Sequence, residues 1–214
     1  RFIAHVLIDG KEEKVHVKNT GRCRELLIPH ARVILAESPN PNRKTRYSLI
    51  AVYKNQVLVN IDSQVPNTVI WDALKDNKIA GFNDTKLLKR EVTFGQSRFD
   101  LYFETASGQK GFVEVKGVTL EEEGMAMFPD APTQRGTKHI REMIQAVEMG
   151  YQGYIIFLVQ MKGVKSFTPN RRMDENFSTA LREAEKAGVK ILVFDANVTP
   201  HDITLGERIE YHLD

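Results

Sequence analysis

Three charged residues, Asp100, Glu114 and Lys116, lie in two segments that are otherwise apolar. Side chains alternate along a strand, so Glu114 and Lys116 project to the same face, and a hairpin of strands 97–104 and 111–117 brings Asp100 beside them. Two carboxylates at one point repel each other unless a proton or a cation lies between them. Because Mg²⁺ prefers carboxylate oxygens, water and phosphate, the sequence predicts a site for one or two Mg²⁺ or Mn²⁺ ions.

This arrangement is the Asp…(Asp/Glu)-x-Lys pattern of metal-dependent nucleases of the restriction-endonuclease type. A lysine beside the ion can position or deprotonate a water, or stabilise the charge that develops at phosphorus. Asp100, Glu114 and Lys116 are therefore the predicted catalytic residues. Triplets of the same kind in polar stretches, such as Glu12–Lys14 and Asp84–Lys86, are interpreted as solvated turns. A surface ion pair on a sheet face is the alternative interpretation, and the motif alone leaves it open.

Further charged residues extend this candidate site. Glu91, just upstream, is predicted as a third metal-binding carboxylate, with a charge at a strand end as the alternative. Four residues are predicted to contact nucleic-acid phosphates: Arg98, Arg135, Lys138 and His139. The last three lie near the start of an expected helix, whose N-terminus favours anions. A solvated helix face would show the same residues.

The elements that position these residues change in type along the chain. The first 65 residues contain only short β-type runs, which predict a small all-β barrel or sandwich. These runs are 2–8, 14–18, 32–36, 47–53 and 57–61. A helix at 66–76 follows, and the pattern lapses at 76–83. We therefore predict two domains, residues 1–80 and 81–214.

The second domain is predicted to be of α/β type. Strands are expected at 89–95, 97–104, 111–117, 153–160, 189–195 and 202–212, and helices at 137–149 and 175–187. The apolar run 153–159 is typical of a central strand buried on both faces. Glycines 150 and 188 are expected to end the two helices.

Composition places the chain among ordinary soluble proteins. Of its 214 residues, 42% are hydrophobic and 27% are charged. Its longest apolar run is far shorter than the roughly 20 residues of a membrane span, so we expect no membrane partner. The single cysteine, Cys23, excludes an internal disulfide, which together with the lack of a secretion leader predicts a cytoplasmic protein. The sequence opens on Arg1 rather than Met, so we expect native residues to precede it.

Five stretches together resemble the sugar fermentation stimulation protein A family. They are residues 19–29, 42–49, 95–104, 112–120 and 128–143. The resemblance implies an N-terminal OB-fold barrel followed by an α/β domain of the restriction-endonuclease-like, or PD-(D/E)xK nuclease, type. It also implies a DNA-binding protein linked to the regulation of sugar (maltose) metabolism. By position, Asp100, Glu114 and Lys116 match the nuclease-like motif. One departure is His30, where the family pattern leads us to expect glycine in a turn.

The implied OB-fold adds candidate nucleic-acid contacts in the first domain. Residues 1–80 hold 13 Lys and Arg against 8 Asp and Glu, a modest basic surplus. OB-folds bind oligonucleotides through one face and its flanking loops. The expected contacts are Arg22, Arg24, Arg43, Lys44 and Arg46, and ordinary solvated loop charges are the alternative.

Three functions stay open at this point. The first is a DNA-binding regulator that keeps a nuclease-like fold and metal site without cleavage, and the second is an active Mg²⁺- or Mn²⁺-dependent DNA phosphodiesterase. The third is an RNA-binding or protein-interaction module. The sequence contains no helix-turn-helix pattern, so sequence-specific readout is not expected. It leaves open whether single- or double-stranded DNA is bound and whether the protein forms a homodimer.

Overall fold

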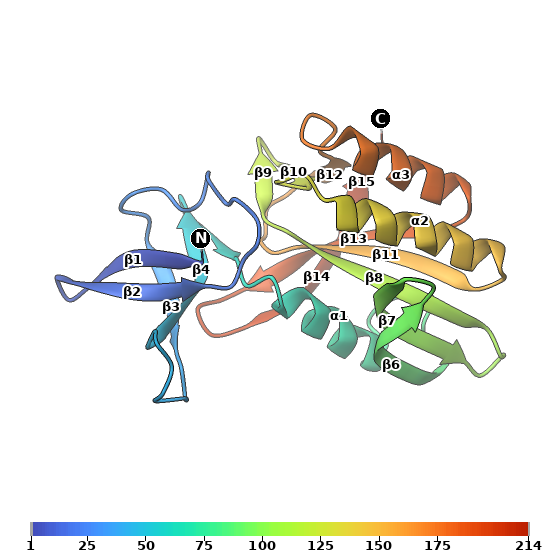
Figure 1. The fold of residues 1–214 in the computed structure, drawn as a ribbon, viewed down its shortest axis with the longest axis horizontal. Coiled ribbons are helices and arrows are strands. Elements are labelled where there is room, and N and C mark those ends of the chain that lie inside the picture. The colour runs from blue at the N-terminus through green and yellow to red at the C-terminus, as the bar shows by residue number, and fades with distance from the viewer. Residues whose placement is uncertain (1, 214) are drawn as a thin grey trace.

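Five short strands build the N-terminal domain of the computed structural model, which describes residues 2–213 (Figure 1). They are β1 (Ile3–Ile8), β2 (Lys11–Val17), β3 (Val33–Glu37), β4 (Tyr47–Lys54) and β5 (Val57–Asn60). The order is β1-β2-β4-β3, and β5 also pairs with β4. The β2–β4 pairing is parallel, and the others are antiparallel. All five strands were predicted from the sequence, with ends shifted by up to three residues.

A six-stranded sheet forms the centre of the second domain, in the order β14-β13-β11-β8-β7-β6. The strands are β6 (Thr85–Phe94), β7 (Ser97–Thr105), β8 (Lys110–Val118), β11 (Gln152–Val159), β13 (Lys190–Val198) and β14 (Ile203–Arg208). The three central strands β8, β11 and β13 are parallel, and the outer strands are antiparallel to their neighbours. From its second residue onward β11 is buried, which confirms the prediction of a central strand covered on both faces.

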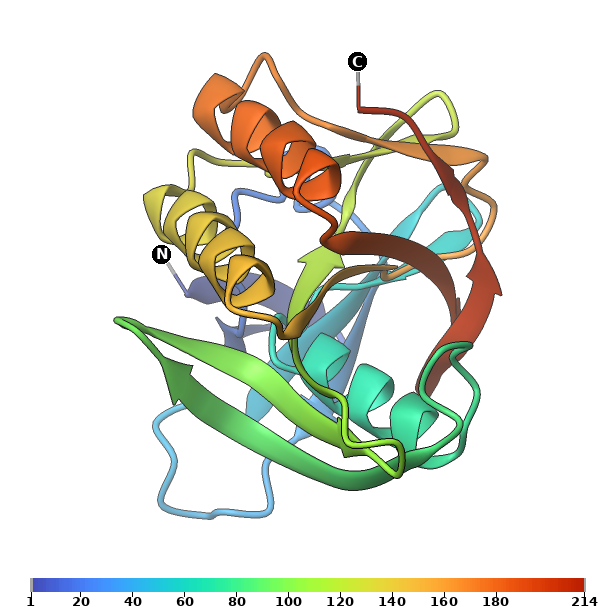
Figure 2. The ribbon, with the colours of Figure 1, turned by 90° about the vertical axis from the view of Figure 1, so that its right-hand side faces the viewer.

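Three helices cover the two faces of this sheet. α1 (Val65–Lys75) lies on one face, whereas α2 (Gln134–Glu148) and α3 (Glu175–Lys186) lie side by side on the other (Figure 2). α2 begins three residues earlier than its apolar spacing predicts, because the Thr133 side chain accepts a hydrogen bond from the Gly136 amide at 3.1 Å and caps the helix. In the described part of the chain, no helix is both long and apolar enough to cross a membrane.

A third, smaller sheet was not predicted. It consists of β9 (Leu120–Glu122), β10 (Met125–Phe128), β12 (Ser166–Pro169) and β15 (Glu210–Tyr211), in the order β15-β12-β10-β9. These strands hold two to four residues, too few for a period to be visible. β9 and β10 form a short local hairpin, whereas the pairing of β12 with β10 and with β15 joins segments more than 40 residues apart, such as Met125 with Ser166. The sheet therefore depends on tertiary contacts rather than on local pattern.

Helix α1 belongs with the second domain. Its buried residues Val69 and Ile70 share a core cluster with Leu101 and Val113 of the six-stranded sheet. This packing places the end of the N-terminal domain before α1, rather than near residue 80 where the lapse in pattern predicted a boundary. The sequence in that region shows only a turn after α1, because the apolar face of a helix does not reveal which sheet it covers.

Buried contacts join the two domains. Cys23 and Leu26, from the N-terminal domain, lie in the same core cluster as Val118 and Phe167 of the second domain. The Gln160 side chain donates a hydrogen bond to Asn60 Oδ1 at 3.0 Å across the junction. The two domains therefore share a core, and a cavity between them has fixed walls.

Candidate metal centre

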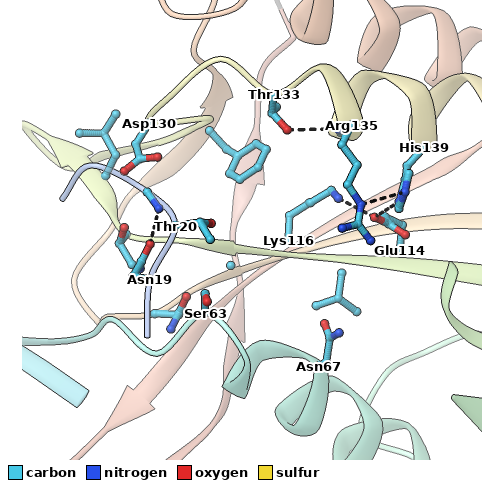
Figure 3. Close-up of a pocket in the computed structure, with 18 of the residues that line it drawn as sticks. Asn19, Thr20, Ser63, Asn67, Glu114, Lys116, Asp130, Thr133, Arg135 and His139 are labelled. Atoms are coloured by element: carbon cyan, nitrogen blue, oxygen red, sulfur yellow. Dashed lines mark hydrogen bonds and ion pairs between the residues drawn. The ribbon is translucent and has the colours of Figure 1, made fainter. Parts of the chain in front are cut away.

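A cavity of about 350 Å³ lies where the two domains meet, and both domains line it. Strand β8 provides Glu114 and Lys116, and the first turn of α2 provides Arg135. Figure 3 shows Asn19 and Thr20 of the N-terminal domain on one side of the cavity, opposite these residues. The cavity therefore contains the three predicted catalytic residues, because Asp100 lines it as well.

Asp100 lies where β7 separates from β8. The last pair of the ladder toward the cavity is Leu101 with Val113, and beyond it the Val115 amide donates to Asp100 Oδ2 at 2.8 Å. Asn67 of α1 donates to the other oxygen, Oδ1, at 2.8 Å. Burial, followed by the nearby Glu114 carboxylate, raises the pKa of Asp100 to about 6. Asp100 is thus held in a fixed orientation, at a position where a bound cation would relieve repulsion.

Glu114 is almost fully buried, with 2% of its surface exposed. Its Oε1 accepts hydrogen bonds from Lys116 Nζ at 2.5 Å and from His139 Nδ1 at 2.7 Å. Burial alone would raise the pKa of Glu114, but Lys116 and His139 outweigh it and lower that pKa below its ordinary value. Its Oε2 is buried and has no hydrogen-bond partner among the described residues. A buried carboxylate oxygen without a partner is costly, so this atom is the strongest indication of a missing ligand.

His139 connects Glu114 to the start of α2. Arg135 Nε donates to His139 Nε2 at 3.4 Å, which leaves the His139 proton on Nδ1, facing Glu114 (Figure 3). His139 is 6% exposed and packs against the Phe99 ring. The sequence predicted His139 as a phosphate contact, whereas the structure places it as a support for a carboxylate.

Glu91 is not brought to the other two carboxylates. Its backbone has a left-handed φ of 54°, which interrupts the β6–β7 ladder opposite Asp100. The side chain lies in solvent, 64% exposed, with its Oε2 at 3.5 Å from the Arg98 guanidinium. The predicted third ligand is therefore an exposed ion pair that does not line the cavity.

The predicted nucleic-acid contacts divide into two groups. Arg135 lines the cavity, and Arg22 and Arg24 are exposed just after residues 19–21, which also line it. Outside the cavity lie Arg43, Lys44, Arg46, Arg98 and Lys138. The first three of these occupy the loop between β3 and β4, which projects away from the second domain (Figure 1).

Asn67 and Asp130 are among the cavity residues that the sequence did not predict. Asn67 supports Asp100, and Asp130 Oδ2 accepts hydrogen bonds from the backbone amides of Arg22 at 2.7 Å and Cys23 at 3.2 Å. Asp130 lies in one of the family-like stretches, which is the only signal in the sequence that could have marked it. Asn67 carries no such signal, because its partner is 33 residues away.

The donor set fits a hard divalent cation. Within residues 2–213 there is no group of three or more His, Cys, Asp or Glu side chains that could hold a metal ion. Zinc sites use at least three protein ligands, so they do not match this pair of carboxylates. Mg²⁺ is commonly held by one or two carboxylates and completed by water and substrate phosphate, which Asp100 and Glu114 could satisfy.

Comparison with known proteins places the chain in a family. A model described as "SfsA N-terminal OB domain" matches residues 1–61, and one described as "Sugar fermentation stimulation protein RE domain" matches residues 64–202. The chain belongs to the sugar fermentation stimulation protein family. The N-terminal OB-fold and the family resemblance are thereby confirmed, and the second family model begins just before α1.

Relatives match over almost the whole chain. A sugar fermentation stimulation protein homolog of Alkaliphilus oremlandii is 57% identical, covering 98% of this chain and 91% of that protein. One of Clostridium novyi is 53% identical, covering 98% and 92%. The solved structure of Pyrococcus furiosus SfsA in complex with Ca²⁺ is 28% identical, with a TM-score of 0.91 over 99% of this chain and 91% of that one.

Proposed function

We propose that this protein is a DNA-binding phosphodiesterase that depends on Mg²⁺ or Mn²⁺ and whose second domain is a restriction-endonuclease-like nuclease. The observation that carries this proposal is the buried, partnerless Oε2 of Glu114, in a cavity shared with Asp100 and Lys116. The mixed sheet with helices on both faces, and the description of the matching family model as an RE domain, support the nuclease assignment. The Ca²⁺ complex of the Pyrococcus furiosus relative supports a divalent ion.

Each residue then has a role in hydrolysis of a phosphodiester. Asp100 and Glu114 would hold the cation, which when bound would supply Lewis-acid chemistry to the phosphate and to the attacking water. Lys116 orients the attacking water and stabilises charge on the phosphate oxygens, while Arg135 and the α2 N-terminus bind the phosphate. The water oxygen forms a bond to phosphorus, one P–O ester bond breaks, and the leaving oxygen takes up a proton.

Cleavage of DNA tests this proposal. Linear, nicked and single-stranded DNA are incubated with the protein and Mn²⁺, with Glu114→Ala as the control. We expect cleavage by the native protein and none by Glu114→Ala. Equal cleavage by both proteins would show that a contaminant or another site is responsible.

A DNA-binding regulator without cleavage is the second candidate. The short contact between Lys116 and Glu114 favours this function, because the Lys116 ammonium can take the place of a metal ion beside the carboxylate. This function predicts DNA binding that weakens as salt rises and that survives loss of Glu114. Competition with single-stranded RNA in the same assay distinguishes the RNA-binding alternative. A link between either activity and sugar metabolism is proposed only on the basis of the family resemblance.

A further inference from the structure

We propose that the cavity admits one nucleic-acid strand and excludes a duplex, because residues 19–23 of the N-terminal domain form a fixed roof over it. This inference rests on the proposed function, since it assigns the substrate class of the same site. The roof segment, residues 19–23, connects β2 to the loop that precedes β3. It lies across the cavity from the metal-binding carboxylates (Figure 3).

Hydrogen bonds from both domains hold the roof segment in place. Asp130, which precedes α2, accepts from the amides of Arg22 and Cys23 through one oxygen, Oδ2. Asn19 donates from Nδ2 to the Ile61 carbonyl at 2.8 Å and accepts from the Gly21 amide at 2.6 Å. A Cβ atom at Gly21 would lie 2.5 Å from Asp130 Oδ2, so the segment and Asp130 are packed as closely as a glycine permits.

The roof segment is also anchored in the core. Cys23 is 1% exposed, and Leu26 just beyond it is 2% exposed. Both pack in the cluster that joins the two domains. Lifting the roof would expose these buried apolar side chains to water, which is unfavourable. The segment therefore acts as a wall and not as a mobile lid.

The size of the cavity suits a single nucleotide. Its volume of about 350 Å³ is near the lower end of ligand pockets, which hold roughly 300 to 1,000 Å³. A duplex presents a major groove of about 12 Å in width in addition to its two backbones. A body of that size does not fit a cavity of about 350 Å³, so we expect one strand, and not a duplex, to reach the carboxylates beneath the roof.

The cavity lining offers separate contacts for the phosphate and for the base of a single strand. Lys116 and Arg135 provide positive charge for phosphate, and the N-termini of α1 and α2 both open onto the cavity through Asn67 and Arg135. Phe128 lines the same cavity and offers a face for a base. Its ring packs against Phe177, with 5.1 Å between the ring centroids.

Cleavage and binding of matched oligonucleotides test the inference. One strand, its blunt duplex and the same duplex with a single-stranded tail are compared, by cleavage in Mn²⁺ and by binding in Ca²⁺. We expect the single strand and the tail to be preferred by about tenfold or more, which is the effect of one stacked base. Equal use of the blunt duplex interior would overturn this inference and leave the nuclease proposal standing. Preferred binding of the single strand without any cleavage would overturn the nuclease proposal alone.

A matched pair of variants tests the role of the roof. Asp130→Ala removes the acceptor of both amides, whereas Asp130→Asn keeps one side-chain oxygen. We expect the preference for a single strand to fall several-fold in Asp130→Ala and to persist in Asp130→Asn. If Asp130→Ala does not fold, Gly21→Ala displaces the roof through its Cβ atom. If the preference for a single strand is unchanged in the variant that folds, Asp130→Ala or otherwise Gly21→Ala, the roof does not set the selectivity.

Discussion

At the scale of single residues, the site is two carboxylates, each supported from a different face of the sheet. α1 supports Asp100 through Asn67, and α2 supports Glu114 through His139. Alternation along the strands made Asp100, Glu114 and Lys116 predictable, because charges in apolar strands need a partner. Asn67 was not predictable, since a polar residue in the first turn of a helix is ordinary until its tertiary contact is known.

His139 is expected to position Glu114, and its substitution should weaken Mn²⁺ binding. His139→Leu removes the donor to Oε1 and should reduce Mn²⁺ affinity by about 10- to 100-fold, as for other residues that orient metal ligands. His139→Asn places an amide donor near the position of Nδ1 and should restore part of the loss. His139→Gln places it near Nε2 and should restore less. Calorimetric titration with Mn²⁺ measures all three, and wild-type affinity in His139→Leu would contradict this role.

Mn²⁺ binding is also expected to depend on pH through Asp100. Its pKa of about 6 means that the metal-free carboxyl is protonated in mild acid and must lose that proton to bind the ion. Affinity should fall about tenfold from about pH 7 to about pH 5 and change little above about pH 7. Calorimetry in two buffers of different ionisation enthalpy should show proton release near pH 6. Affinity independent of pH over this range would contradict the assignment.

The same raised pKa sets the sign of one contribution to folding stability. The folded-state pKa of Asp100 exceeds its unfolded value, so the contribution is fully present below the unfolded pKa and is lost as pH rises through about 6. Metal-free protein therefore loses stability from this group as the pH rises from its ordinary pKa of 3.8 to about 6, with little further change above that. Bound Mn²⁺ should reverse that loss.

At the scale of elements, long strands and amphipathic helices could be predicted, and short paired segments could not. The helices were predicted from apolar residues at helical spacing and, for α2 and α3, from stop glycines, with errors of up to three residues at their ends. β9, β10 and β12 were missed because each is three or four residues long, and because β10 and β12 pair with each other across more than 40 residues. The structure places the domain boundary before α1, whereas the sequence predicted it near residue 80. The domain of a helix is set by the sheet that it packs against, and the sequence of α1 does not reveal that sheet.

His30 offers a test of local backbone conformation. It stands where the family pattern predicts glycine, and its φ of 64° is left-handed, a conformation that costs about 1–2 kcal/mol for a residue with a Cβ atom. His30→Gly should therefore raise the free energy of unfolding by about 0.5 kcal/mol, after the larger loss of chain entropy for glycine. His30→Ala, which keeps the Cβ atom, should give no gain. Urea denaturation measures both, and equal midpoints for His30→Gly and His30→Ala would contradict the explanation.

At the scale of the whole molecule, the two domains form one cooperative body. Their shared core cluster and the Gln160–Asn60 hydrogen bond connect them, and the cavity lies at this junction. The sequence predicted two domains and a site within the second one. It could not predict that the N-terminal domain forms a wall of that site, because Asp130 and its partner Cys23 are 107 residues apart.

Cooperative unfolding follows from this shared core. The single tryptophan, Trp71, lies in α1 and reports on the second domain, whereas far-ultraviolet circular dichroism reports on both domains. We expect the two signals to follow one transition in urea, with the same midpoint. A separate transition seen only by circular dichroism would show that the N-terminal domain unfolds independently, and the roof would then not be rigid.

In the proposed function, Asp100 and Glu114 together hold a divalent ion. Anomalous scattering from a crystal soaked in Mn²⁺ tests it most directly, since it locates the ion without relying on activity. We predict an anomalous peak within coordination distance of Glu114 Oε2 and an Asp100 oxygen. An absence of any peak there, with Lys116 bridging both carboxylates at saturating Mn²⁺, would contradict the account.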